Sequence, residues 1–215
     1  YITSYNANMV SNEVFIDSAT LRENVVSLAR NIGYTPRSSK SSRANISFIV
    51  NTANYSTKPQ TITLNKGVVA TSQAFGVENY TFSIMEDITV PVENDIATFS
   101  NIDVYEGTYV TAEFSYNTFD PNQRYILDNS NIDISTINVT WKPSALSSVK
   151  RRYRRSDSLF EVTSESPVYW VQEIEDERYE LIFGDGIFGI ALQEPNFLEV
   201  TYLVNNGSNS NGISD

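Results

Sequence analysis

Apolar residues follow a helical period near the start of the chain. Four of them recur at spacings of three and four: Leu21, Val25, Leu28 and Ile32. Such spacing places side chains on one face of an amphipathic helix. We therefore expect this face to be buried against another surface, either of this chain or of another polypeptide.

Both ends of this helix are marked. Thr20 and Glu23 have the Ser/Thr-x-x-Glu spacing of a capping box, which predicts that the helix begins at about Thr20. Gly33 can adopt the left-handed conformation that ends a helix, and Pro36 prevents the helix from resuming. Residues 1–17 also indicate a helix, although their Asn and Ser residues are weak helix formers. Four apolar residues share one side of it: Ile2, Tyr5, Met9 and Ile16.

From residue 44 the period of the apolar positions changes to two, as in strands with one buried face. No helical pattern interrupts the series, which is typical of an antiparallel sandwich or barrel. We therefore predict an α+β, mainly β chain with a helix pair in residues 1–36. An antiparallel β-sandwich or barrel-like domain follows in residues 37–215. The predicted strands are 44–50, 61–64, 80–84, 88–92, 96–105, 108–116, 124–127, 132–141, 168–174, 179–183 and 197–204.

Glycine and proline mark the turns between these strands. Gly67 supplies positive φ after Asn65 and Lys66, and Gly107 predicts a hairpin between the strands on either side of it. Pro91 has no N–H, so its strand should lie at a sheet edge or end there. Asp185 and Gly186 lie between apolar residues, which favours a tight hairpin turn.

The net charge and the absence of Cys and His exclude several classes of function. The chain has 215 residues, a net charge of -11, a sequence pI near 4.5, and neither Cys nor His. The charge argues against general nucleic-acid or anionic-membrane binding. Without Cys or His, thiolate catalysis, thiolate metal sites and the usual general base are excluded. We therefore expect no catalytic residue, no cofactor and no metal.

Three stretches could carry chemistry. The basic stretch 150–155 could contact nucleic acid, but in an acidic chain a solvated loop or a docking patch for an acidic protein is favoured. The acidic run 173–177 lacks the EF-hand pattern for Ca²⁺ and is interpreted as a polar turn. The glycine-rich stretch 183–189 lacks the phosphate-loop pattern, so a structural turn is the default.

Several motifs occur in a recognisable order. They are the helix and Gly-Tyr-Thr-Pro at 20–36, the turn at 64–67, the strands at 80–82 and 86–90, Glu106-Gly107, Asn131-Ile132-Asp133, Phe183-Gly184-Asp185-Gly186 and the Asn/Gly-rich stretch 205–212. In this order they resemble the baseplate wedge proteins of contractile-tailed bacteriophages, within the broader baseplate J-like group. The resemblance covers nearly the whole chain. The basic stretch 150–155 departs from it and has no known role in the family.

The resemblance implies a structural protein of the virion tail baseplate, without catalysis and assembled in the cytoplasm of the bacterial host. In the family, two copies of this subunit join a second wedge protein through bundled helices, and the wedges form a ring around the central hub. By that plan the partner-binding face would be Ile2, Tyr5, Met9, Leu21, Val25, Leu28 and Ile32. The chain would be an N-terminal-half fragment, with the wedge-pairing region beyond Asp215 and no nucleic-acid or membrane partner.

The main alternative is a carbohydrate-binding tail or surface adhesin. The chain has 13 Tyr and 2 Trp, and a β-sandwich can present such rings for stacking on sugars. Exposed, coplanar aromatic rings around Trp141 or Tyr169-Trp170 would favour the adhesin. Burial of both Trp would argue against it.

Overall fold

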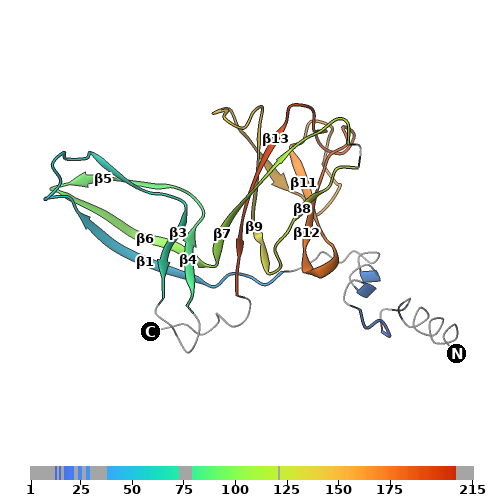
Figure 1. Ribbon diagram of the computed structural model, residues 1–215, viewed down its shortest axis with the longest axis horizontal. Coiled ribbons are helices and arrows are strands. Elements are labelled where there is room, and N and C mark those ends of the chain that lie inside the picture. The colour runs from blue at the N-terminus through green and yellow to red at the C-terminus, as the bar shows by residue number, and fades with distance from the viewer. Residues whose placement is uncertain are drawn as a thin grey trace. The chain divides into compact units, whose positions relative to one another are not determined.

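The computed structural model describes residues 13, 15, 17–21, 24–25, 28–29, 38–72, 79–120 and 122–206 (Figure 1). These residues are mainly β, as predicted, and include thirteen strands. The strands are β1 (Arg43–Asn51), β2 (Thr61–Leu64), β3 (Gly67–Thr71), β4 (Thr81–Ile84), β5 (Ile88–Glu93), β6 (Ile96–Glu106), β7 (Thr108–Ser115), β8 (Tyr125–Leu127), β9 (Ile132–Lys142), β10 (Arg151–Arg155), β11 (Val168–Glu173), β12 (Tyr179–Phe183) and β13 (Phe197–Val204).

The chain divides into two compact units, which are described separately. Unit 1 comprises the described residues within Tyr1–Arg37, Phe114–Ser130 and Thr140–Leu198. Unit 2 comprises those within Ser38–Glu113, Asn131–Val139 and Glu199–Asp215. Strands β7, β9 and β13 contribute residues to both units.

Strands β1 to β6 form an antiparallel sheet in unit 2 (Figure 1). Its order is β2-β5-β6-β4-β3, and β1 also pairs with β6 along most of its length. Alternate side chains of the strands meet in a core, where the Phe48 and Phe99 rings stack with centroids 4.8 Å apart. The buried members of this core are Ile84, Ala97, Phe99, Ile102 and Val104.

The second sheet has seven strands in the order β7-β13-β9-β10-β11-β12-β8. It is mixed, because β10 and β11 run parallel while β11 and β12 run antiparallel. Gln123 connects its two end strands, since the side-chain Nε2 of this residue, just before β8, donates to Ser115 O of β7 at 2.6 Å. The rings of Phe114 and Tyr125 also meet edge to face, 5.6 Å apart. The sheet is therefore nearly closed and barrel-like rather than one layer of a sandwich.

Described residues of the N-terminal segment support only short helical stretches. Asn24, Val25, Leu28 and Ala29 are helical, and Val25 N–H donates to Leu21 O at 3.1 Å. The described residues contain no helix of seven or more residues. The rest of the predicted helix pair lies outside them, including Ile2, Tyr5, Met9, Ile32, Gly33 and Pro36.

Glu13 organises the turn before this helical stretch. The capping box predicts that the backbone N–H of Thr20 donates to the side chain of Glu23, which lies outside the described residues. In the structure this N–H donates to Glu13 Oε1 at 3.0 Å. Thr20 Oγ1 and Asn24 Nδ2 also donate to the Glu13 carboxylate, at 2.7 and 2.8 Å. The sequence missed this partner because it lies seven residues upstream of Thr20, beyond the spacing of a capping box.

Two pairing predictions are wrong. Strands β6 and β7 do not form a hairpin: β6 pairs with β1, β4 and β5, whereas β7 pairs with β13. The strand with Pro91 neither ends there nor forms a sheet edge, since β5 runs to Glu93 between β2 and β6. Pro91 itself is paired with Thr61 of β2, and the pairing with β6 begins only at Val92, so the missing N–H costs no ladder hydrogen bond to β6.

Gly107 is the residue at which the chain leaves one sheet for the other. Its φ is +132°, and a Cβ there would lie 2.8 Å from Val204 O. Both the conformation and the close approach therefore require glycine. Gly67 also has positive φ, +120°, as predicted, but a Cβ there would meet nothing within 4 Å.

We predict that Gly107→Ala lowers the free energy of unfolding by about 2 to 4 kcal/mol, from strained φ plus a clash. The control Gly67→Ala has the strain without the clash and should cost about 1 to 2 kcal/mol. Urea denaturation followed by circular dichroism measures both. Equal losses for the two variants would show that the contact with Val204 is unimportant.

A second prediction concerns the pH dependence of the Glu13 cap. Hydrogen bonds from Asn24, and then Thr20, lower the pKa of Glu13 from 4.5 to about 2. Because the folded-state pKa is depressed, the cap should be complete above about pH 4.5 and be lost as the pH falls through about 2. Carboxyl ¹³C NMR of the full chain measures this pKa, and Asn24→Ala should raise it. An unshifted Glu13 in the unaltered chain would contradict the described cap.

Candidate functional site

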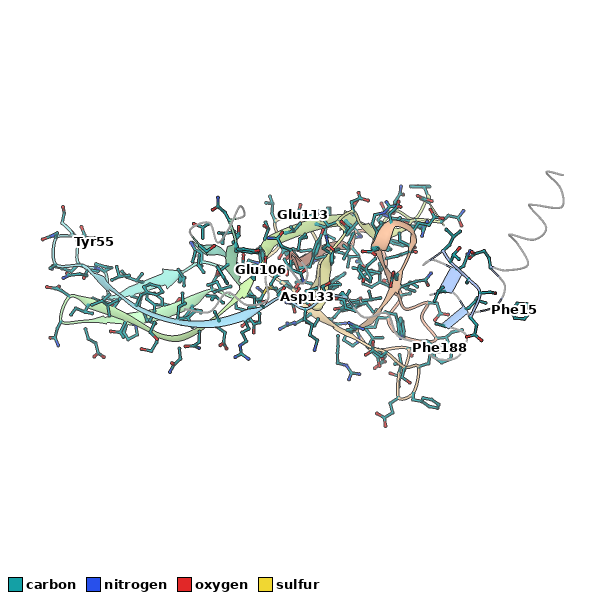
Figure 2. All side chains as sticks on the ribbon, turned by 90° about the horizontal axis from the view of Figure 1, so that it is seen from below. Phe15, Tyr55, Glu106, Glu113, Asp133 and Phe188 are labelled. Carbon is teal, nitrogen blue, oxygen red and sulfur yellow. The ribbon has the colours of Figure 1, made fainter. Side chains whose placement is uncertain are left out.

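Three residues from distant parts of the sequence hold the segment 38–42, which leads into β1, in unit 2. We call Glu106, Asp133 and Asn205 the polar clamp; Figure 2 labels the first two. All three are buried. The hydrogen bonds to the segment are Ser41 N–H to Asp133 Oδ2 at 2.8 Å, Asn205 Nδ2 to Ser39 O at 3.1 Å and Glu106 N–H to Ser42 O at 2.7 Å.

Asp133 is 3% exposed, so its carboxylate depends on protein donors. Its Oδ2 accepts from Ser41 N–H at 2.8 Å, and its Oδ1 accepts from Ser135 N–H at 3.0 Å and Ser135 Oγ at 2.6 Å. Burial of an unpaired charge would be very costly, whereas three short hydrogen bonds offset much of that cost. The hydrogen bond from Ser41 N–H to the buried Asp133 carboxylate therefore fixes the position of Ser41.

The clamp also holds the chain where it leaves β13. Asn205 N–H donates to Asn131 O at 3.1 Å, and Asn206 N–H donates to the fully buried Glu106 at Oε1, 3.3 Å away. The incoming segment and the outgoing segment are thus fixed within one unit. The motifs that carry the family resemblance at 106–107, 131–133 and 205–206 therefore meet at one place. The sequence located each motif, but no periodicity indicated that they touch.

A second feature is a rigid loop that presents apolar side chains. Asp185 Oδ1 accepts from Ile187 N–H at 2.9 Å and Phe188 N–H at 2.8 Å, and these bonds lower the pKa of the Asp185 carboxyl, with the bond from Phe188 contributing most. Ile187 is 70% exposed and Phe188 44% exposed. Figure 2 labels Phe188. The chain bends at residues 186–189, and Gly186 has φ +90°. The predicted hairpin is wrong, because β12 pairs with β11 and β8, and β13 with β7 and β9.

The neighbouring loop, 156–167, is joined to this one. Gly189 N–H donates to Thr163 O at 3.0 Å, and Ile190 N–H donates to Ser166 O at 2.9 Å. The joined loop carries two further exposed apolar residues, and we call the four together the loop surface. Exposed apolar groups on rigid loops are typical of protein interaction sites. The loop surface is Leu159, Phe160, Ile187 and Phe188, of which Phe160 is 89% exposed.

The basic stretch is strand β10 and not the predicted loop. Tyr153 explains the strand: it is 5% exposed and meets the Phe183 ring edge to face at 5.6 Å. Its neighbours Arg152 and Arg154 are exposed, as alternation in a strand requires. The ring between the arginines is buried and could not stack on bases, which argues against a nucleic-acid patch.

The other predicted sites have simpler outcomes. The acidic run forms the predicted polar turn, a 3₁₀ turn η1 (Glu175–Glu177) between β11 and β12. Among the described residues, no group of three or more Asp or Glu could hold a metal ion.

On the predicted helix face, Leu21 is 46% exposed, and Val25 and Leu28 are half-buried. No helix in the described part of the chain is long and apolar enough to cross a membrane.

Comparison with known proteins identifies a relative. No protein-family model matches the chain. The baseplate wedge protein gp6 of Enterobacteria phage T4 is 24% identical over 230 aligned residues, which cover 99% of this chain and 33% of that protein. The chain is a distant homologue of a phage baseplate wedge protein. It spans about a third of the length of that relative.

We predict that Asp133→Ala removes the protein acceptor of Ser41 N–H and of the two donors of the exposed Ser135, and lowers the free energy of unfolding by about 1 to 3 kcal/mol. The Ser41 amide should then exchange with solvent much faster. Asp103→Ala is the matched control: this carboxylate of the same unit pairs with Arg43 at the surface, and its loss should cost about 1 kcal/mol or less. Urea denaturation and amide exchange NMR measure these effects. Protection of Ser41 that is unchanged in Asp133→Ala would contradict the clamp.

Proposed function

We propose that this chain is a structural component of a contractile phage tail baseplate wedge, acting through protein contacts and without catalysis. The observation that carries the proposal is its homology to a baseplate wedge protein over 99% of its length. The virion tail baseplate would be its location, reached by assembly in the host cytoplasm. Its partners would be a second copy of itself, another wedge protein and other baseplate and hub proteins.

The polar clamp supports this proposal. A baseplate component must transmit load without turnover, which requires persistent contacts rather than titrating catalytic groups. The clamp fixes residues 38–42 and Asn206 to the same unit through buried hydrogen bonds. Force applied through the segment before Ser38 would therefore reach the β-sheet through Asp133 and Asn205.

Two surfaces are proposed to meet partners. The first is the N-terminal segment of residues 1–36, where Phe15 is 66% exposed and Leu21 46%. Bundling of long helices gains no support from the described residues, so the proposal for this segment rests on its exposed apolar side chains. The second is the loop surface, whose backbone is fixed before any partner binds and whose ordering therefore costs little on binding.

The adhesin alternative is disfavoured by the tryptophans. Trp141 and Trp170 are half-buried, and Tyr169 is 2% exposed. A sugar platform needs an aromatic face open to solvent. At the two places named by the sequence, the rings are half-buried or buried rather than fully exposed.

The decisive experiment mixes the full chain with the other wedge proteins of the same phage and measures mass by light scattering. The proposal predicts a defined heteromer. A chain that remains alone with every wedge protein would contradict the proposed function.

A double variant tests the loop surface. Ile187→Ser with Phe188→Ser removes exposed apolar contact and should weaken the heteromer at least about tenfold, as expected when anchor residues are lost. The control Tyr55→Ser changes a residue of unit 2 that is 51% exposed and should leave assembly unchanged. Circular dichroism checks that both variants fold. Full assembly of the folded double variant would remove the loop surface from the account.

A further inference from the structure

The outer edge of β1 is a long strand edge of unit 2 that lacks a partner strand. Within the described residues, β1 pairs with β6 and with no other strand, and Figure 1 draws it in blue at the border of this sheet. The strand has nine residues, whereas β2 and β3, which end the path of the same sheet, have four and five. A free edge displays backbone N–H and C=O groups to which another strand can bind.

The pairing with β6 shows which backbone groups of β1 face outward. Just before β1, Ser42 O accepts from Glu106 N–H at 2.7 Å, and just after it, Thr52 N–H donates to Asp95 O at 2.8 Å. Such bonds alternate along an antiparallel strand, so the even-numbered residues of β1 direct their backbone groups to β6. The odd-numbered residues direct theirs away from β6, and they are Arg43, Asn45, Ser47, Ile49 and Asn51.

This outer edge is regular and unguarded. The register shift between Ile46 and Phe48 places an extra residue in β6, opposite Ser47, so β1 itself has no bulge. In β6, Asn101 has φ +54° and donates its N–H to Ser47 Oγ at 3.0 Å. Natural sheets guard free edges with charges, proline or bulges in the edge strand. Residues 44–51 contain no charged residue, no proline and no glycine.

The apolar side chains of β1 are incompletely covered. Ile46, Phe48 and Val50 pack against the core of unit 2 but remain half-buried. On the opposite face of the strand, Ile49 is 64% exposed. A strand added at this edge would bury more of these side chains while it pairs the outward backbone groups. The edge therefore offers both hydrogen bonds and apolar contact to a partner strand.

We propose that this edge binds β1 of a second copy of the chain, antiparallel, with Ser47 opposite the partner's Ser47. In this register all nine residues pair, and every outward residue lies opposite another outward residue, which allows about ten N–H···O bonds. On the core face, Ile46 meets the partner's Phe48. The one charge of the strand, on Arg43, lies opposite the partner's Asn51, so no like charges meet.

The self-complementary register is the reason to assign a second copy rather than an unrelated strand. A contact that uses the same edge in both copies has two-fold symmetry and closes as a dimer, because neither β1 keeps a free edge. Covering the edge in this way also removes the hazard of an unguarded strand. The inference rests on the proposed function only in that a second copy is one of the partners named there.

The first test uses the unaltered full chain. Sedimentation over a range of concentrations measures its mass, and amide hydrogen exchange is followed under the same conditions. The outward amides of Ser47 and Ile49 should be protected only in the dimer, so their protection should rise with concentration. The amide of Phe48 faces β6 and should be protected throughout. A chain that stays monomeric at NMR concentrations, or outward amides whose protection does not depend on concentration, would overturn the inference.

A pair of variants at one position separates backbone pairing from side-chain contact. Ile49→Pro removes an outward N–H and leaves the bonds to β6, as proline on an edge strand does, and should weaken the dimer at least about tenfold. Ile49→Thr keeps the N–H and the β-branched shape, and should weaken the dimer less than about threefold. Circular dichroism checks that both variants fold. Equal weakening by the two variants would show that strand pairing is not the contact.

A cross-link tests the register. The chain has no cysteine, so Ser47→Cys introduces a single thiol, which in the proposed dimer lies opposite its counterpart. Mild oxidation should then link the two copies covalently. The control is Thr61→Cys, an exposed position on the edge strand β2, which should not link. Linking of the control as readily as of Ser47→Cys would contradict the register.

The outcome is separable from the proposed function. A dimer paired through β1 that binds no wedge protein would contradict the wedge role alone. A heteromer with wedge proteins in which the outward amides of β1 stay unprotected would contradict the pairing alone. Protection of these amides only after a different wedge protein is added would overturn the second copy as the occupant.

Discussion

The buried carboxylate of Asp133 is the constraint on which much of unit 2 depends. Asp133 is only 3% exposed, so its carboxylate needs hydrogen-bond donors from the protein. Ser41 and Ser135 supply them. Because Ser41 belongs to the segment that precedes β1, this requirement fixes where the chain enters the sheet. Glu106 and Asn205 add contacts to the same segment and to the outgoing chain. The segment that enters β1 and the segment that leaves β13 are thereby both held by hydrogen bonds within unit 2.

The positions of eleven of the thirteen described strands could be predicted from the sequence because each depends on local alternation, whereas β3 and β10 were not predicted. The bounds 61–64, 179–183 and 197–204 are those of β2, β12 and β13. Their partners could not be predicted in the same way, since pairing depends on contacts far apart in the chain. Gly107 shows the limit: a glycine between two strands is typical of a hairpin, yet this glycine is required by a close approach to Val204, 97 residues later.

The candidate sites show the same division. Asp185 and Gly186 predicted a turn from the sequence. The sequence did not predict that the backbone N–H groups of Ile187 and Phe188 both bind the Asp185 carboxylate, which fixes the loop that exposes these two apolar side chains. The arginines of β10 were identified by composition, whereas the strand depends on Tyr153 packing against Phe183. Glu13 carried no signal at all, because its partners lie at Thr20 and Asn24, beyond the spacing of any capping motif. The predicted helix face remains a proposal, and most of it lies outside the described residues.

We propose that the polar clamp of unit 2 and the exposed apolar loops of unit 1 suit this chain to being held among other proteins of a baseplate. Cross-linking mass spectrometry on purified phage tails tests this most directly, because it finds the neighbours of the chain in the assembled particle. We predict cross-links to other baseplate wedge proteins from Lys150, which directly precedes β10, and from Lys40 in the segment held by the polar clamp. A particle whose baseplate lacks this chain, or in which it is cross-linked only to fibre or host-binding proteins, would contradict it.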